Sequence, residues 1–219
     1  GGTIDNNPFA IGTSGEAYVD MDFDPDHNLW AVGDNPDVFK VNIQDGSVTS
    51  YSIFEDIVEP FVIDSVRNEL NDPEAEVSVD FRAVRYYDGK LYMGGRVPDR
   101  TEEGSLEIWT LDVANGEVSN PQQYLNISEI ADVDFDLFTI TFDANGTLFM
   151  GTDTGTGIYT WNDSDGLEEF YPGLLQPTGY SFAWTDNFLV ASATNIEEET
   201  RYALKIDVRR EGATYYGVD

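Results

Sequence analysis

The stretch from Asp136 to Pro172 constrains the fold more than any other part of the chain. It contains four short apolar runs separated by turns or a loop, which read DLFTITF, TLFMG, IYTWN and LEEFYP. Over 138–142, phenylalanine or isoleucine alternates with threonine, which is the period of a half-buried strand. Asp143–Gly146 and Asp163–Gly166 combine Asx side chains that bond the nearby backbone with a glycine that accepts positive φ. The stretch therefore predicts four consecutive antiparallel strands.

Related units occur three more times, so that the predicted blades cover about 16–54, 77–119, 135–172 and 179–219. Their third strands share one pattern, an apolar residue followed by Asn or Asp, with a glycine four or five residues later. These are Val41-Asn42, Leu111-Asp112, Trp161-Asn162 and Ile206-Asp207, followed by Gly46, Gly116, Gly166 and Gly212. The repeat predicts an all-β chain, with residues 1–219 forming a single small β-propeller domain of about four four-stranded antiparallel blades. The alternative is a β-sandwich with coincidental hairpins.

Two segments interrupt the repeat. Residues 55–76 form an insertion between the first two blades, and Pro60 begins a short amphipathic helix expected near 59–71. Residues 1–15 are either a loose arm or a strand that closes the ring, and a fifth blade is an alternative. A fragment of a longer chain and association with a second copy also stay open. A closed ring is favoured because an open arc leaves strand edges free to pair.

The third unit, FDANGTLFMGTDTGTGIYTWNDSDG, resembles a blade of the two-component-regulator type of β-propeller. Its rhythm of a DxxG turn, an apolar strand and a GT loop is similar to NHL, lactonase-like and PQQ-like repeats. The resemblance covers 17–53 and 77–216, and the third unit matches it best. It implies the propeller fold. Because such families include sensors, adhesins, lyases and lactonases, it does not fix an activity.

The chain is strongly acidic, with 42 acidic residues against 11 basic ones and a net charge of −31. This charge excludes nucleic acid as a partner, because phosphate is repelled. Calcium chelation and adaptation to high salt, where the Debye length falls to about 3 Å at 1 M, are two explanations. The acids are spread along the chain and lysines are few, which resembles the composition of halophilic archaeal proteins. An ordinary acidic secreted protein is the alternative. No apolar run approaches the ~20 residues of a membrane span, and there is no cysteine.

Catalytic signatures are scarce. His27 is the one histidine of the chain and lies in the predicted turn 24–28, where we expect it to be solvated. A Ser-His-Asp site needs that histidine, and no histidine cluster suits zinc. Carboxylate pairs for hydrolysis carry no signal among so many acids. The sequence therefore favours a protein that is not an enzyme. The alternative is a calcium-dependent propeller hydrolase or lyase acting on a lactone or glycan.

Calcium is the metal that the oxygen-rich side chains suit best. The turn containing Asp24, Asp26 and Asn28 is a weak candidate site, whereas we expect the alternating Asp20, Asp22 and Asp24 to form a solvated acidic face. No cofactor other than calcium is indicated. Three triplets fit the N-glycosylation pattern and are compatible with an extracellular location. They begin at Asn126, Asn145 and Asn162.

The connections differ in regularity. Short turns join the first strand to the second and the third to the fourth, so they share one rim of a propeller, and the long connections share the other. Function tends to reside in variable loops on a rigid scaffold. The candidate ligand- or partner-binding residues on that irregular rim are Arg67, Arg96, Arg100, Tyr124 and Arg201. Alternatively, these arginines only pair with nearby glutamates.

The predicted function is a non-enzymatic extracellular β-propeller of a high-salt organism. We expect it to act as a surface interaction, adhesion or ligand-binding module on a cell envelope or virion. Its expected partner is a protein or glycan at the irregular rim, without a membrane span, and a homo-oligomer or larger assembly stays open.

Overall fold

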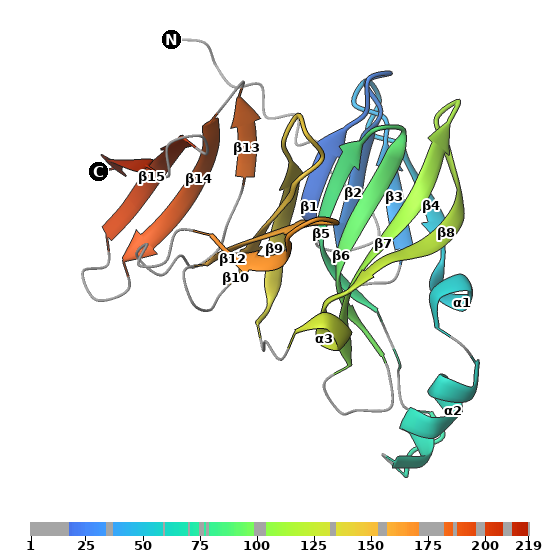
Figure 1. The fold of residues 1–219 in the computed structure, drawn as a ribbon. Helices are drawn as coiled ribbons and strands as arrows, with labels where there is room; N and C mark the ends of the chain where they lie inside the picture. Colours follow the sequence, from blue (N-terminus) through green and yellow to red (C-terminus); the bar gives the residue numbers. More distant parts are fainter. Residues whose placement is uncertain are drawn as a thin grey trace.

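The computed structural model describes residues 18–33, 37–58, 60–69, 71–74, 77, 79–98, 104–131, 135–152, 157–170, 182–185, 188–195, 200–207 and 212–218. These residues form four four-stranded antiparallel sheets (Figure 1). In every sheet the order of the strands follows the chain, as expected for consecutive hairpins. The prediction of an all-β fold built from four-stranded antiparallel blades is confirmed.

The strands have the following bounds. The first sheet contains β1 (Tyr18–Phe23), β2 (Leu29–Gly33), β3 (Asp37–Val41) and β4 (Val48–Ser52). The second contains β5 (Asp80–Tyr87), β6 (Lys90–Val97), β7 (Ser105–Ala114) and β8 (Glu117–Asn126). The third contains β9 (Leu137–Phe142), β10 (Leu148–Thr152), β11 (Ile158–Asn162) and β12 (Gly166–Glu169). The fourth contains β13 (Phe182–Thr185), β14 (Phe188–Asn195), β15 (Thr200–Asp207) and β16 (Gly212–Val218).

Three short helices accompany the sheets in the described part of the chain: α1 (Phe54–Ile57), α2 (Pro60–Glu69) and α3 (Ile127–Ile130). Helix α2 confirms the predicted helical insertion, and it begins at the proline expected in its first turn. None of the helices in the described residues is long and apolar enough to cross a membrane.

The sheets follow one another around their first strands. Strand β1 packs beside β5, β5 beside β9, and β9 beside β13 (Figure 1). Between the first two sheets, Trp30 and Val32 of β2 meet the apolar face of the second sheet, including Val84 and Met93. A second layer, which includes Ile140, fills the space between the second and third sheets. This arrangement of sheets face to face around their first strands is that of propeller blades.

Close backbone approach explains one glycine of this arrangement. A Cβ atom on Gly95 of β6 would lie 1.9 Å from the carbonyl oxygen of Asp80 and 2.7 Å from the Cα of Phe81. Both atoms belong to the backbone of β5 beside it, so they cannot swing away as a side chain would. Glycine is therefore required where the end of β6 pairs with the start of β5.

The orientation of β1 is opposite to our prediction. Asp20 accepts a hydrogen bond from the backbone N–H of Val84 at 3.0 Å, and Asp22 accepts one from Tyr86 at 2.9 Å. Both donors lie on β5, which is an edge strand of the second sheet. The carboxylates of Asp20 and Asp22 accept the N–H bonds that a neighbouring strand would otherwise accept. Arg85 lies between Val84 and Tyr86 in the sequence, and its Nη1 lies 3.3 Å from the carboxylate of Asp22.

The alternate residues of β1 consequently point away from β5. Val19, Met21 and Phe23 have 45, 42 and 49% of their surface exposed. The expectation of a solvated acidic face on β1 is therefore wrong, because its acids satisfy backbone donors of the next sheet. Leaving a buried backbone N–H group unpaired costs free energy. This cost outweighs the usual preference of acidic side chains for contact with water.

The two rims differ as the sequence indicated. The turns β1–β2, β3–β4 and β7–β8 lie at the upper end of Figure 1, and the three helices lie at the lower end. The N-terminal arm, and with it the predicted ring closure or fifth blade, lies outside the described residues.

Candidate binding pocket

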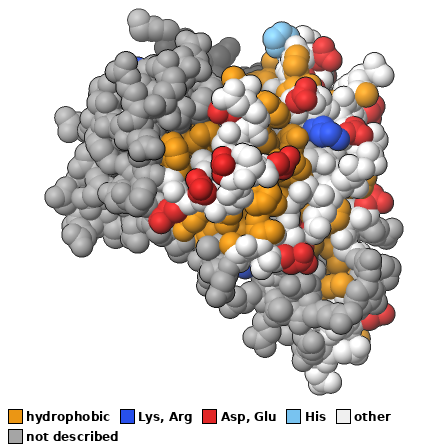
Figure 2. Space-filling view, viewed as in Figure 1, with side chains coloured by type: hydrophobic (Ala, Val, Ile, Leu, Met, Phe, Trp, Pro, Cys, Tyr) orange, Lys and Arg blue, Asp and Glu red, His pale blue; other side chains and the backbone are white. Residues whose placement is uncertain are grey.

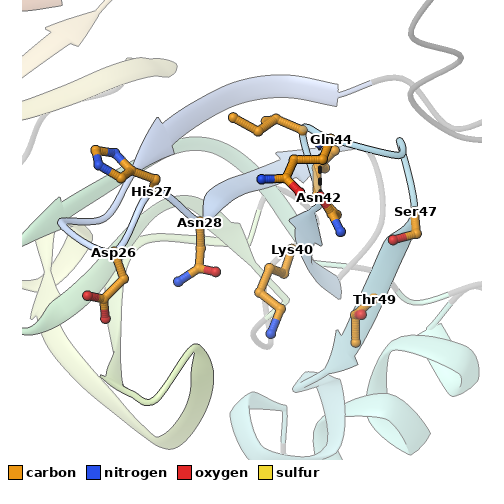
Figure 3. A pocket seen from close by; sticks show the side chains of 10 residues that line it. Asp26, His27, Asn28, Lys40, Asn42, Gln44, Ser47 and Thr49 are labelled. Atoms are coloured by element: carbon orange, nitrogen blue, oxygen red, sulfur yellow. Dashed lines mark hydrogen bonds between the residues drawn. The ribbon is translucent and has the colours of Figure 1, made fainter.

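A cavity of about 550 Å³ opens on the first sheet at the rim of short turns (Figure 3). It is lined by three segments: residues 26–28 of the β1–β2 turn, residues 40–44 of β3 and the turn after it, and Ser47 and Thr49 near the start of β4. Its volume lies in the range of about 300–1,000 Å³ that is usual for ligand pockets. The pocket lies at the rim that the sequence indicated as scaffold.

The β1–β2 turn is organised by the carboxylate of Asp24. Its Oδ1 accepts from the backbone N–H groups of Asp26 at 3.0 Å and Asn28 at 2.9 Å. Its Oδ2 accepts from Asn28 Nδ2 at 2.8 Å and from Trp30 Nε1 at 2.9 Å. Burial acts to raise the pKa of Asp24, but the bonds from Asn28 and Trp30 outweigh burial and hold this pKa below its ordinary value. The turn is thus fixed from within, and Asn28 is held at the pocket wall.

The same bonds bear on the predicted calcium site. A carboxylate offers about four lone-pair sites, and all four of those on Asp24 face N–H donors. No group of three or more His, Asp or Glu side chains in the described residues is placed to hold a metal ion. Calcium at Asp24, Asp26 and Asn28 stays a prediction, and the geometry of Asp24 does not favour it.

The β1–β2 turn has a counterpart in the β9–β10 turn. In both turns an aspartate accepts from the backbone N–H groups two and four residues later, at 2.8 Å for each bond of Asp143. The fourth residue of each turn has positive φ, 64° at His27 and 85° at Gly146. His27 thus occupies the left-handed position that glycine fills in the other copy. It is exposed, as predicted, and lines the pocket.

Lys40 of β3 lies on the pocket wall and contacts the second sheet. Its Nζ donates to the carbonyl of Gly116 in the β7–β8 turn and lies 3.5 Å from Glu117 Oε1. The ammonium also lies 5.8 Å from the ring centroids of both Trp30 and Tyr51, the distance of a cation–π contact. Burial acts to lower the pKa of Lys40, but Tyr51 and Glu117 outweigh it and raise the pKa above its ordinary value. Lys40 is therefore charged at any physiological pH.

The predicted arginines of the irregular rim are only partly described. Arg96 of β6 lies with its Nε 3.3 Å from Asp136, and the Nη1 of Arg82 on β5 lies 3.9 Å from the same carboxylate. The structure thus places Arg96 close to Arg82, which the sequence did not single out. Arg67 lies half-buried on α2. Arg100 and the side chain of Arg201 lie outside the described residues.

Tyr124, a candidate binding residue of the irregular rim, lies in an aromatic cluster between the second and third sheets, and its binding role stays a prediction. Its ring makes an edge contact with Tyr92 at 5.2 Å, and Phe142 lies 4.5 Å from Tyr92 and stacks on Tyr87 at 4.4 Å. Burial, helped by the nearby Tyr124 and Asp88, raises the pKa of Tyr92 to about 12. Figure 2 shows hydrophobic side chains gathered in the middle of one face of the described molecule, with acids among them. Tyr124 keeps 38% of its surface exposed.

The three predicted glycosylation asparagines differ in their surroundings. Asn126 caps α3 by accepting from Glu129 N, and its Nδ2 lies 3.3 Å from Glu107. The Nδ2 of Asn162 donates to Asp165 at 2.9 Å. Asn145 is exposed in the β9–β10 turn. Glycosylation stays a prediction at all three positions, and Asn145 is the most accessible of them.

Comparisons with known proteins agree on the fold. No protein-family model matches the chain, and a search of curated proteins found no match. Among solved structures, the chain is similar to the nidogen/laminin complex, with a TM-score of 0.55 and 11% identity over 88% of this chain and 62% of that chain. It is similar to RS223 β-xylosidase, with a TM-score of 0.54 and 13% identity over 93% of this chain and 79% of that chain. It is also similar to TolB from Acinetobacter baumannii, with a TM-score of 0.51 and 11% identity over 94% of this chain and 44% of that chain.

The chain spans less than two thirds of the nidogen/laminin structure and of TolB. At such low identity these likenesses concern the fold, and activities do not transfer with it. Together with the four described sheets, they show that the chain has an all-β fold of the β-propeller type.

Proposed function

We propose that the protein is a β-propeller binding module that holds a ligand in the pocket on its first sheet. The observation that carries this proposal is the cavity of about 550 Å³ with the Lys40 ammonium in its wall. The wall is built from two hairpins and braced against the second sheet through Gly116 and Glu117. Polar groups held in fixed positions in a concave site orient a ligand and give specificity.

The alternative is a calcium-dependent hydrolase or lyase acting on a lactone or glycan. Such chemistry calls for a carboxylate that is available to a metal or to the substrate. In the turn beside the pocket, Asp24 uses both carboxylate oxygens to accept N–H groups, whereas Asp26 is exposed. The described geometry thus supports binding more directly than it supports hydrolysis.

The proposed setting is the exterior of a cell or virion in a high-salt organism. The net charge of −31 supports it, since salt at about 1 M screens repulsion between acids more than ~3 Å apart. The solved structures similar to this chain include a complex between two proteins, nidogen and laminin, and a xylosidase. A protein or glycan ligand is consistent with the kinds of protein in these structures. The irregular rim near Arg96 and Arg82 stays a candidate surface for a partner, and self-association stays open.

A fragment screen on the full chain tests the pocket. Lys40→Met removes the ammonium but keeps the length of the stem, and Lys90→Met is a matched control. Lys90 pairs with Asp112 on the second sheet and does not line the pocket. We expect fragments that perturb NMR signals of residues 26–28 and 40–49, and we expect these effects to weaken in Lys40→Met but persist in Lys90→Met. A screen in which no fragment perturbs those signals, or in which the two variants behave alike, would contradict the proposal.

A further inference from the structure

The chemical groups in the pocket indicate what class of ligand it takes, if the proposed binding function holds. Its wall presents the amides of Asn28, Asn42 and Gln44, the hydroxyls of Ser47 and Thr49, the Asp26 carboxylate and the Lys40 ammonium. Amides and hydroxyls both donate and accept hydrogen bonds. The wall is therefore suited to a ligand whose own groups do both.

The charges at the pocket disfavour an ionic ligand. The positive charge of Lys40 is compensated by Glu117 at 3.5 Å, and Asp26 adds an exposed negative charge. An anion approaching the pocket also meets the repulsion of a chain with a net charge of −31. A cation would have to be placed beside the Lys40 ammonium. A neutral ligand avoids both penalties.

Hydrogen-bonding capacity remains on both sides of the cavity. An ammonium has three N–H donors, and those of Lys40 face the Gly116 carbonyl, the Glu117 carboxylate and the Tyr51 hydroxyl, so a ligand meets mainly the charge of this group. Among the described residues, the side chains of Asp26 and Thr49 make no hydrogen bond. Figure 3 shows the side chains of Asp26, Lys40 and Thr49 pointing in the same direction from their separate segments.

From these observations we propose that the pocket binds a neutral, hydroxyl-rich carbohydrate. In this assignment the Lys40 ammonium attracts one sugar oxygen, which shares an N–H with a protein acceptor, and Asp26 accepts from a hydroxyl group. Thr49 contacts a hydroxyl from the β4 side. Neighbouring sugar hydroxyls both donate and accept, which matches a wall that offers an ammonium, a carboxylate and a hydroxyl within one cavity. The cation–π contacts with Trp30 and Tyr51 hold Lys40 in place before the ligand arrives, which limits the ordering that binding requires.

The test uses the full chain on an array of immobilised neutral, acidic and amino sugars at about 1 M salt, where non-specific charge effects are screened. We expect retention of one or more neutral glycans and none of the amino sugars. Lys40→Met is expected to weaken that binding by about tenfold to a hundredfold, the usual effect of losing a charged hydrogen bond. Asp26→Asn and Thr49→Val should each weaken it by about tenfold, whereas Lys90→Met should leave it unchanged.

Failure of this inference is distinguishable from failure of the proposed function. If fragments without hydroxyl groups perturb the pocket signals while no neutral glycan is retained, the pocket binds ligands but the carbohydrate assignment is wrong. Retention of acidic sugars alone would also overturn it, because it contradicts the argument from charge. Equal losses in Lys40→Met and Lys90→Met would place the glycan elsewhere on the molecule. If neither fragments nor glycans bind at the pocket, both proposals fail.

Discussion

Replacing Asp20 by asparagine should make the protein more stable at neutral pH. Asp20 is largely buried against β5, where it accepts from Val84 N at 3.0 Å, and its other oxygen accepts from Met21 N at 2.9 Å. Burial raises the pKa of Asp20 from 3.8 to about 6, although the Val84 bond and the charge of Arg85 act in the opposite direction. An ionised Asp20 therefore destabilises the folded state at neutral pH.

The size of this effect follows from the shift. Each unit of pKa corresponds to about 1.36 kcal/mol, so a rise from 3.8 to about 6 corresponds to about 3 kcal/mol. Because the folded pKa is the higher one, this contribution to stability is fully present below about pH 4 and is lost as pH rises through about 6. An asparagine does not titrate, and its side-chain oxygen can still accept from Val84.

The assay is urea unfolding of the wild type and of Asp20→Asn at a fixed high salt concentration, across this pH range. We expect the free energy of unfolding of the variant, relative to the wild type, to increase by about 3 kcal/mol between about pH 4 and pH 7. Subtracting the free energy of unfolding of the wild type from that of the variant cancels the contributions of the other acids to the pH dependence. One of these is Asp24, whose pKa is lowered and whose contribution has the opposite sign. Asp22→Asn is the control, since it loses the ion pair with Arg85 and should be destabilised by about 1 kcal/mol at neutral pH. A difference between Asp20→Asn and wild type that does not change with pH would refute the reasoning.

Three further outcomes are expected. His27→Gly should raise the free energy of unfolding by about 0.5–1 kcal/mol, and Gly146→Ala should lower it by about 1 kcal/mol, since both positions have positive φ. Chemical unfolding in which Gly146→Ala is more stable than His27→Gly would contradict this. Gly95→Ala should lower the free energy of unfolding by about 3 kcal/mol or more, because its Cβ would meet the backbone of Asp80. Gly89→Ala, with open space around its Cβ, should lower it by only about 1 kcal/mol. Equal melting temperatures for the two variants would refute the steric argument. The protein should unfold below about 0.5 M salt, as followed by circular dichroism, because its acids then repel one another across the surface; full stability in dilute buffer without calcium would exclude this adaptation.

The features predicted correctly from the sequence are local ones. Strands β9 to β12 coincide with the apolar runs of the third unit, because alternation and Asx–Gly turns act over a few residues. The prediction for the second unit is less accurate, since it ends the fourth strand near Ser119 whereas β8 continues to Asn126. Asn120 adopts a φ of 58° and a register shift follows in the pairing with β7, so the strand passes Pro121 through an irregularity. Asn-Pro in sequence resembles the end of a strand, and only the pairing partner shows otherwise.

The orientation of β1 could not be predicted from alternation alone. A period of two shows that Asp20 and Asp22 share one face and that Val19, Met21 and Phe23 share the other, but it does not show which face meets the next sheet. The deciding interactions are the bonds to Val84 and Tyr86, which lie 64 residues further along the chain. Burial of acids on β1 is therefore a property of the packed pair of sheets.

The pocket was missed for a related reason, although one local signal was present. The turns DPDHN and DANGT are two copies of one structure, and only the first has a side chain at the left-handed position. A side chain kept where glycine is favoured often marks a site of function. The position of Lys40 against Gly116, 76 residues away, needs the packing of two sheets and is not visible in the sequence.

The location of the pocket also bears on the assumption that function resides in the irregular loops. That assumption holds when a site needs long segments for its shape, but recognition by hydrogen bonds needs polar groups held in fixed positions. The β1–β2 turn provides this, since two bonds from its backbone N–H groups to Asp24 fix the turn and a third, from the Asn28 side chain, holds Asn28 at the pocket beside His27. Lys40, held by two aromatic rings and a carbonyl of the next blade, is equally constrained. A short, stereotyped turn is thus compatible with a binding role, because its rigidity limits the conformational entropy that a ligand must remove.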